Sequence, residues 1–264
     1  MKIIYCWILL ATFPCYGAEA WTESDEVGKL FAQWEVSGAF VIYDPQLDKF
    51  IGYNHRRSKT RFIPASTFKI PHALIGLDVG AVQHVDEVLP YGGALQPVPA
   101  WERDMSLRSA LPISNFPVFQ TLARRITLER MSVHLARMQY GNQEIGLSAD
   151  RFWLDGPLTI SPIEQTLFLA KLARNQLPYS PELQNQVREI TLIDSGVDWE
   201  LYAKTGWTQV PEPAIGWWVG WVVSGSKVYS FALNMDINSE EDAAKRIPLG
   251  RDSLVTLGVL TREK

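Results

Sequence analysis

The chain contains 264 residues, of which 47% are hydrophobic and 20% are charged, a composition typical of a globular protein with one or two domains. This composition excludes a disordered chain, a collagen-like chain and a membrane protein with several spans. Lys and Arg together number 25 against 29 Asp and Glu, and no run of basic residues stands out, so no nucleic-acid partner is expected.

The N-terminus has the pattern of a secretory signal peptide. A charged start precedes the apolar run Ile3–Phe13, which is too short for a stable membrane span, and Ala18-Glu19-Ala20 is an Ala-x-Ala cleavage site. We therefore expect cleavage after Ala20, a mature single domain of residues 21–264, and a secreted, periplasmic protein without membrane attachment. An uncleaved anchor is the alternative, and it is disfavoured because no second apolar stretch or stop-transfer charge cluster follows.

Both cysteines of the chain, Cys6 and Cys15, lie in this leader. Its removal would leave a mature protein with neither a disulfide nor a cysteine nucleophile, although an exported compartment is oxidising. The stability of the mature protein is then expected to come from packing.

The first part of the mature chain predicts helices around two strands. Ser24 can cap a helix, because an apolar face with helical spacing follows it. Strands are predicted over 38–43 and 49–53, joined by a turn at Asp44-Pro45, and a helix is predicted over 67–77.

The middle of the chain reads as mostly helical, and the end returns to strands. Within 92–193, Thr127 can cap one helix, and Ser161-Pro162-Ile163-Glu164 is a capping box that opens another. Strands are predicted over 199–204, 216–223 and 227–235, and a closing helix over 247–260.

This order of elements predicts an α/β protein of the α+β type. Strands at both ends of the chain indicate one mostly antiparallel sheet, flanked by helices and completed late in the sequence. The helical stretch, roughly 92–193, is then an inserted all-helical subdomain.

Most catalytic signatures are absent from the sequence. The four histidines have no metal-ligand spacing, so no metal is expected, and His72 beside an apolar helix is interpreted as structural. The chain has no Walker A loop, no dinucleotide-binding glycine motif and no Gly-x-Ser-x-Gly elbow. Nucleotide enzymes, zinc hydrolases and α/β-hydrolases are therefore disfavoured, and no organic cofactor is expected.

The sequence does contain a serine paired with a lysine. Ser66 and Lys69 are three residues apart where a helix should begin, so both side chains share one face and Lys69 can reach Ser66. A serine hydroxyl is a poor nucleophile until a base removes its proton. A bare Ser-x-x-Lys is also common as a helix cap followed by a solvated lysine, so this pair alone does not establish chemistry.

Two later elements favour the catalytic interpretation. Ser114-Asn115-Phe116 lies in the helical middle, and Lys204-Thr205-Gly206 precedes Trp207 at a strand end. Each has a plain structural interpretation, as a helix cap and as a strand end with a turn. In this order, however, Ser-x-x-Lys, Ser-x-x and Lys-Thr-Gly form the signature of penicillin-recognising serine acyl-transferases.

Six stretches of the mature chain carry a closer resemblance: Pro64–Pro71, Tyr140–Asn142, Phe152–Leu154, Lys204–Trp207, Gly216–Trp221 and Asn234–Asp236. Their residues resemble those of one branch of that superfamily, the class D or oxacillinase-type β-lactamases. The resemblance extends over the mature chain, and it implies the β-lactamase/transpeptidase-like fold.

The resemblance implies a set of catalytic roles. Ser66 would be the acyl-ester nucleophile, and Lys69 would be N-carboxylated by carbon dioxide or bicarbonate to act as the general base. Ser114 would relay a proton to the leaving β-lactam nitrogen. The backbone N–H groups of Ser66 and Trp207 would form the oxyanion hole, and Trp153 would donate a hydrogen bond to the carbamate.

Substrate binding is assigned by the same resemblance. Lys204, Thr205, Gly206 and Trp207 would hold the substrate, with Thr205 contacting its carboxylate. Leu154 and Phe116 would support the site beside Trp153.

The physical chemistry of lysine favours the modification independently. An ordinary lysine, with a pKa of about 10.4, is protonated at neutral pH and cannot act as a base. Burial among apolar side chains such as Phe68, Phe116, Trp153 and Leu154 would lower that pKa. A neutral amine can then capture carbon dioxide and become an anionic oxygen base.

Two positions depart from the pattern of the class D family, and a third resembles a residue of another class. The middle motif of the family usually ends in Val, whereas Phe116 stands here and could alter water access to Lys69. The usual carboxylate-binding Arg has no clear counterpart, so Arg246 is the proposed substitute, with a solvated charge as the alternative. Glu164 resembles a deacylation Glu of class A enzymes in its distance from Ser66, but its capping-box position favours a structural role.

The leading functional hypothesis is a secreted serine β-lactamase that hydrolyses penicillins and related antibiotics and confers resistance. One alternative is a β-lactam sensor domain that stays acylated, and another is a cell-wall DD-peptidase. The expected partners are small-molecule β-lactams, and a monomer or a homodimer is expected.

Overall fold

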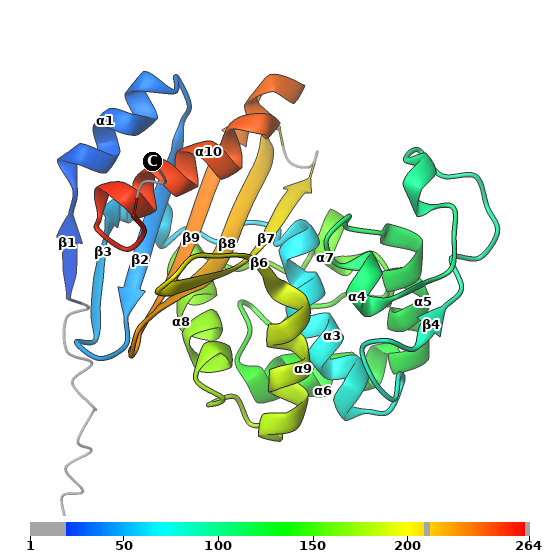
Figure 1. Ribbon diagram of the computed structural model, residues 1–264. Helices are drawn as coiled ribbons and strands as arrows, with labels where there is room; N and C mark the ends of the chain where they lie inside the picture. Colours follow the sequence, from blue (N-terminus) through cyan, green and yellow to red (C-terminus); the bar gives the residue numbers. More distant parts are fainter. Residues whose placement is uncertain (1–19, 209–211, 262–264) are drawn as a thin grey trace, which may run out of the picture.

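The computed structural model describes residues 20–208 and 212–261 (Figure 1). The predicted leader up to Glu19, with both cysteines, lies outside these residues. Among the described helices, none is both long and apolar enough to cross a membrane.

Within the described residues, the chain forms a seven-stranded sheet in the order β1-β3-β2-β9-β8-β7-β6. Neighbouring strands are antiparallel, except that β1 runs parallel to β3. Gly38 pairs with Met235, so the C-terminal strands complete the sheet next to the N-terminal hairpin, as predicted. The strands are β1 (Trp21–Glu23), β2 (Gly38–Asp44), β3 (Lys49–Tyr53), β6 (Leu192–Ser195), β7 (Trp199–Thr208), β8 (Ala214–Ser224) and β9 (Lys227–Ile237).

Helices cover both faces of this sheet, which confirms the predicted α/β class. Helices α1 and α10 pack together on one face, and α8 lies against β2, β8 and β9 on the other (Figure 1). The helices are α1 (Asp25–Gln33), α2 (His55–Ser58), α3 (Lys69–Asp78), α4 (Leu107–Ala110), α5 (Phe116–Ile126), α6 (Leu128–Met138), α7 (Phe152–Asp155), α8 (Pro162–Ala173), α9 (Pro181–Thr191) and α10 (Glu240–Thr256).

Three helices, α1, α6 and α8, begin at the capping side chains that the sequence predicts. Ser24 accepts a hydrogen bond from Val27 N and opens α1, and Thr127 opens α6. Both bonds of the predicted capping box are present, since Ser161 N donates to the Glu164 carboxylate and Glu164 N donates to Ser161 Oγ. These side chains satisfy N–H groups that the first turn of a helix leaves free.

The prediction for the last helix was wrong at both ends. Helix α10 begins at Glu240, because Ser239 accepts a hydrogen bond from Asp242 N, and the helix passes through Pro248 before it ends at Thr256. Proline is common in a first helical turn and rare inside a helix, so Pro248 gives no local sign of the eight helical residues that precede it.

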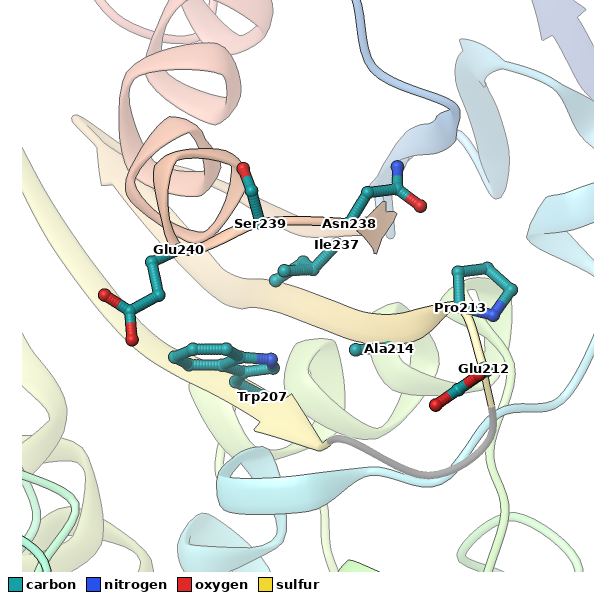
Figure 2. Close-up of a pocket in the computed structure, with 8 residues that line it drawn as sticks. All are labelled: Trp207, Glu212, Pro213, Ala214, Ile237, Asn238, Ser239 and Glu240. Carbon is teal, nitrogen blue, oxygen red and sulfur yellow. The ribbon is translucent and has the colours of Figure 1, made fainter.

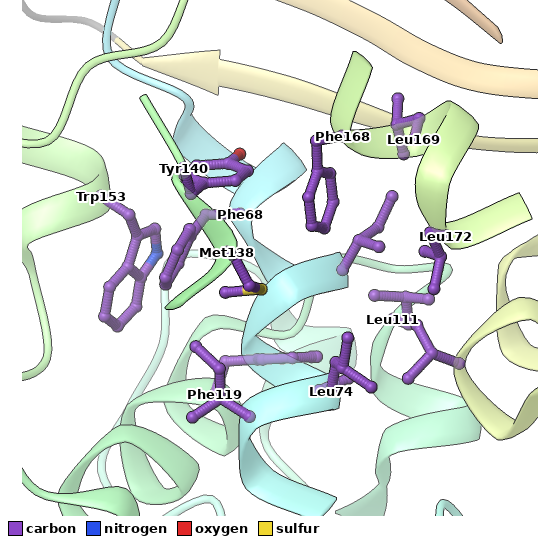
Figure 3. Packing of buried hydrophobic residues seen from close by; sticks show 14 of the residues in the cluster. Phe68, Leu74, Leu111, Phe119, Met138, Tyr140, Trp153, Phe168, Leu169 and Leu172 are labelled. Atoms are coloured by element: carbon purple, nitrogen blue, oxygen red, sulfur yellow. The ribbon is translucent and has the colours of Figure 1, made fainter. Parts of the chain in front are cut away.

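Helix α3 runs through the helical part of the molecule and is almost wholly buried. Its residues Lys69 to Leu77 are all buried, and Figure 3 shows Leu74 of this helix in one cluster with Phe68 and Phe119. Strand β5 (Met105–Ser106) lies within the predicted helical segment, 92–193, and pairs with β4 (Val88–Leu89) just before that segment. The sequence pattern did not indicate this short ribbon.

Candidate active site

Ser66 lies in a tight 3-10 turn, Ala65–Phe68, that leads directly into α3. Ala65 is buried and has a φ of 51°, in a left-handed region that non-glycine residues rarely adopt. Thr67 fixes the turn, since its hydroxyl donates to Pro64 O at 2.7 Å and accepts from Gln165 Nε2 at 2.8 Å. Strain of this kind persists when its surroundings enforce it, and it gathers at functional sites.

Lys69 is brought to Ser66 as its spacing predicts. Its Nζ donates to Ser66 Oγ at 2.9 Å and lies 5.3 Å from the centroid of the Phe119 ring. The lysine is 1% exposed. Burial, and next the charge of Lys204, hold the pKa of the Lys69 amine well below its ordinary value.

Ser114 reaches the same place from the loop before α5. Its φ of 56° is again left-handed, and the next residue, Asn115, caps α5 by accepting a hydrogen bond from Val118 N at 3.1 Å. Asn115 is fully buried, and its Nδ2 donates to Trp101 O at 3.3 Å. The loop is therefore held so that Ser114 Oγ accepts a hydrogen bond from Lys204 Nζ at 2.5 Å.

The Lys204-Thr205-Gly206 segment lies inside strand β7. The sequence placed it at a strand end, but pairing with β8 continues as far as Thr208. Strand β6 pairs with β7 at Glu200 to Tyr202, so the pairing with β6 stops before Lys204. This stretch of β7 packs against the turn that holds Ser66.

Gly206 permits that close approach. A Cβ at this position would lie 3.0 Å from Pro64 O and 3.0 Å from Thr67 Cγ2. These distances are shorter than ordinary van der Waals contacts, so a side chain would push the strand away from Ser66.

A cavity of about 230 Å³ connects these groups. Its described lining residues include no acidic side chain and are Ser66, Trp101, Ser114, Thr205, Gly206, Trp207 and Arg246. The structure thus gathers the three motifs around one space. Trp101 is a lining residue that the sequence did not indicate.

The cations beside this cavity are partly desolvated. Lys204 is 4% exposed, and burial together with the charge of Arg246 lowers its pKa to about 7. Arg246 is held by two main-chain carbonyls, since Nη1 donates to Gly206 O and Nε donates to Ala243 O, each at 2.6 Å. The site is therefore suited to an anionic group.

Three predicted supporting residues, Trp153, Leu154 and Phe116, are not among the described residues that line the cavity. Trp153 is fully buried and stacks on Phe68 with 5.8 Å between the ring centroids. Its Nε1 has no hydrogen-bond partner among the described residues. Phe116 is half-buried, and the Arg151 guanidinium lies 5.9 Å from its ring centroid.

Glu164 is used structurally, as its position predicts. Besides the capping box, its carboxylate accepts two-pronged hydrogen bonds from Arg61, at 2.5–3.0 Å. It does not line the cavity with Ser66. Within the described residues, no cluster of His, Cys, Asp and Glu could hold a metal ion.

A second cavity, of about 450 Å³, adjoins the first at Trp207 (Figure 2). It lies between the end of β7 and the start of α10, with Glu212 and Glu240 among its lining residues. Apart from Trp207, no motif residue lines it, so the reactive groups are those of the smaller cavity.

Comparison with known proteins agrees with this geometry. Residues 38–254 match the family model described as the penicillin binding protein transpeptidase domain. The chain is 36% identical to β-lactamase OXA-5 of Pseudomonas aeruginosa, over 98% of this chain and 99% of that protein. It is 38% identical to β-lactamase OXA-48 of Klebsiella pneumoniae, over 94% of this chain and 91% of that protein.

Solved structures show the same relationship. The class D β-lactamase FUS-1 (OXA-85) of Fusobacterium nucleatum subsp. polymorphum superposes with a TM-score of 0.88 at 39% identity, over 91% of this chain and all of that one. The class D β-lactamase YbXI from Nostoc superposes with a TM-score of 0.86 at 39% identity, over 89% of this chain and 99% of that one. These relatives favour a hydrolase over a sensor or a DD-peptidase. The chain therefore belongs to the class D β-lactamases and is a serine β-lactamase.

Proposed function

We propose that this β-lactamase opens the β-lactam ring through an acyl-enzyme on Ser66, and that Lys69 serves as the general base after N-carboxylation. The observation that carries the proposal is the Lys69 amine, buried at 2.9 Å from Ser66 Oγ in apolar surroundings. A buried amine with a lowered pKa is neutral in a larger fraction of molecules, and a neutral amine is nucleophilic.

The residues around Lys69 fit a carboxylated side chain. Carboxylation joins Nζ to the carbon of carbon dioxide and releases one proton from the amine. When the resulting carbamate is present, its anionic oxygen can act as a base. Trp153 Nε1, fully buried and without a partner among the described residues, is a donor suited to such an oxygen.

In acylation, Ser66 Oγ attacks the β-lactam carbonyl carbon while the base removes its proton. The Ser66 and Trp207 backbone N–H groups stabilise the developing oxyanion, as donors fixed in advance do in other acyl transfers. The C–N bond then breaks, and the nitrogen takes a proton from Ser114 Oγ. Lys204, which donates to that oxygen at 2.5 Å, returns the proton.

Binding uses the positive charge of the cavity. Lys204 and Arg246 attract the substrate carboxylate, and the Thr205 hydroxyl donates to it. Arg246 is held at the cavity by the Gly206 carbonyl, which supports this role over that of a solvated surface charge. In deacylation a water attacks the ester carbonyl, and Ser66 leaves with the proton that the base transfers to it.

The cellular context belongs to the same proposal. Residues 1–20 direct export and are removed, and the mature enzyme acts in the periplasm as a monomer or a homodimer. There it hydrolyses β-lactams before they reach their targets, which confers resistance.

Turnover of a chromogenic cephalosporin tests the proposed base. Enzyme degassed at mildly acidic pH should lose rate during turnover, because protonation of the amine favours loss of carbon dioxide, and added bicarbonate should restore the rate. Lys69→Ala should lose the bicarbonate response together with turnover, by about 10²–10⁴-fold or more. Equal rates with and without bicarbonate would contradict the proposal.

A further inference from the structure

His72 lies one helical turn after Lys69 on α3, on the same face of the helix. It is fully buried. Its ring packs among three aromatic side chains, with centroid distances of 5.5 Å to Phe68, 5.5 Å to Phe119 and 5.1 Å to Trp153. Phe119 also lies beside the Lys69 amine, so the lysine and the histidine share one aromatic enclosure.

This enclosure holds polar nitrogen atoms that have no partner. Among the described residues, neither His72 Nδ1 nor His72 Nε2 has a hydrogen-bond partner, and the same is true of Trp153 Nε1. Buried polar groups are nearly always paired, because an unpaired one loses its hydration without compensation. The Lys69 amine and the His72 ring both lie against Phe119, and Trp153 packs on His72, so a polar group added to that amine would have these unpaired nitrogens in its enclosure.

The protonation state of His72 fits such a role. Burial, and next the charge of Lys69, lower its pKa to about 3. The ring is therefore neutral at working pH, with one N–H donor and one acceptor nitrogen. The larger cause, burial, persists when Lys69 carries a carbamate, whereas the positive charge of the lysine does not. A neutral ring N–H can donate a hydrogen bond to the anionic carbamate oxygen.

We propose that His72 is a positioning residue for the carboxylated Lys69, to which its ring donates a hydrogen bond alongside the one from Trp153. This inference rests on the proposed function. A carboxylate-like group has two oxygens that together accept about four hydrogen bonds. It can therefore accept one from each of Ser66, Trp153 and His72. The bond from His72 holds the modified side chain in place and raises the affinity of Lys69 for carbon dioxide.

The test compares two substitutions at this position. His72→Phe keeps an aromatic ring but removes both nitrogens, whereas His72→Asn keeps an N–H donor. His134→Phe is a matched control, because His134 is a mostly buried histidine paired with Tyr179, away from the cavity. Carbon-13 NMR with labelled bicarbonate, titrated at fixed pH, gives the dissociation constant of carbon dioxide from Lys69 in each folded protein.

We expect His72→Phe to weaken carbon dioxide binding by about tenfold or more, the loss typical of one hydrogen bond to a charged group. His72→Asn should stay close to wild type, and so should His134→Phe. Thermal unfolding provides a second measurement, since a ligand that binds the folded state raises the midpoint. Bicarbonate should therefore raise the midpoint of the wild type more than that of His72→Phe.

Three results would overturn the inference. An unchanged dissociation constant in His72→Phe would show that the ring nitrogens do not hold the modified lysine. Equal losses in the Phe and Asn variants would assign the effect to packing of the ring. A wild type without any carbamate signal would overturn the proposed base as well, whereas the first two results leave that base standing. If His72→Phe does not fold, His72→Leu gives the same comparison, with the same loss expected.

Discussion

Lys204 Nζ donates a hydrogen bond to Ser114 Oγ across 2.5 Å, and this contact ties strand β7 to the loop before α5. The two residues are separated by 90 positions in the sequence. One comes from the sheet and the other from the helical part, so the cavity with Ser66 lies where these two parts meet.

This contact leads to a prediction about pH. The pKa of Lys204 is lowered to about 7, by burial and next by the charge of Arg246. The protonated lysine binds an anionic substrate, and this form is lost as the pH rises through the pKa. For the free enzyme we therefore expect kcat/KM to fall as the pH rises above about 7.

Arg246→Gln should move this alkaline limb to higher pH, because the substitution removes a positive charge that lowers the pKa of Lys204. Binding should also weaken at every pH, but the position of the limb is the decisive measurement. Arg251→Gln is the control, since Arg251 lies on the same helix and pairs with Asp194. An alkaline limb at the same pH in Arg246→Gln and wild type would contradict the assignment.

Ser66→Ala should abolish acylation, because it removes the hydroxyl that Lys69 contacts at 2.9 Å. Intact-mass measurement after incubation with a penicillin should show a stoichiometric adduct for the wild type and none for the variant. Ser132→Ala, which alters an exposed serine on α6, should form the adduct normally. A full adduct on Ser66→Ala would place the nucleophile elsewhere.

Glu164→Ala should lower stability but not the rate of the folded enzyme. The substitution removes half of the capping box and the pairing with Arg61, which together should cost about 1 kcal/mol of the free energy of unfolding. Denaturant unfolding and steady-state turnover of the folded fraction separate the two effects. A loss of turnover of 10²-fold or more at full folding would instead indicate a catalytic Glu164.

The exported protein should begin near Trp21 and contain no thiol, since Cys6 and Cys15 precede the expected cleavage site. Intact mass and thiol titration of protein recovered from the periplasm measure both properties. A mass that retains either cysteine would count against the predicted signal peptide.

The sequence predicted the site well where motifs encode local geometry. The spacing of Ser66 and Lys69 fixes their contact on one helical face, and capping residues located the starts of α1, α6 and α8. Motif order also associated Ser114 with Lys204. Their separation in the chain means that only tertiary packing could show the contact itself.

Other parts of the site depend on packing that no local pattern reports. Trp101 lies in a segment without helical or strand periodicity, and it lines the cavity because the buried Asn115 side chain holds its carbonyl. His72 was interpreted as structural, since a lone histidine beside apolar residues gives no sign of its neighbours. Phe68, Phe119 and Trp153 enclose its ring, and within the described part of the chain its nitrogens have no hydrogen-bond partner, which only the tertiary structure shows.

The carboxylated Lys69 is the central claim, and carbon-13 NMR tests it most directly. Active wild-type enzyme at neutral pH, supplied with labelled bicarbonate, should show a carbamate signal that disappears in Lys69→Ala and fades as the pH is lowered. The fading follows because protonation of the buried amine competes with carbon dioxide. Active enzyme without a Lys69-dependent carbamate signal would contradict the account and leave an unmodified Lys69 as the base.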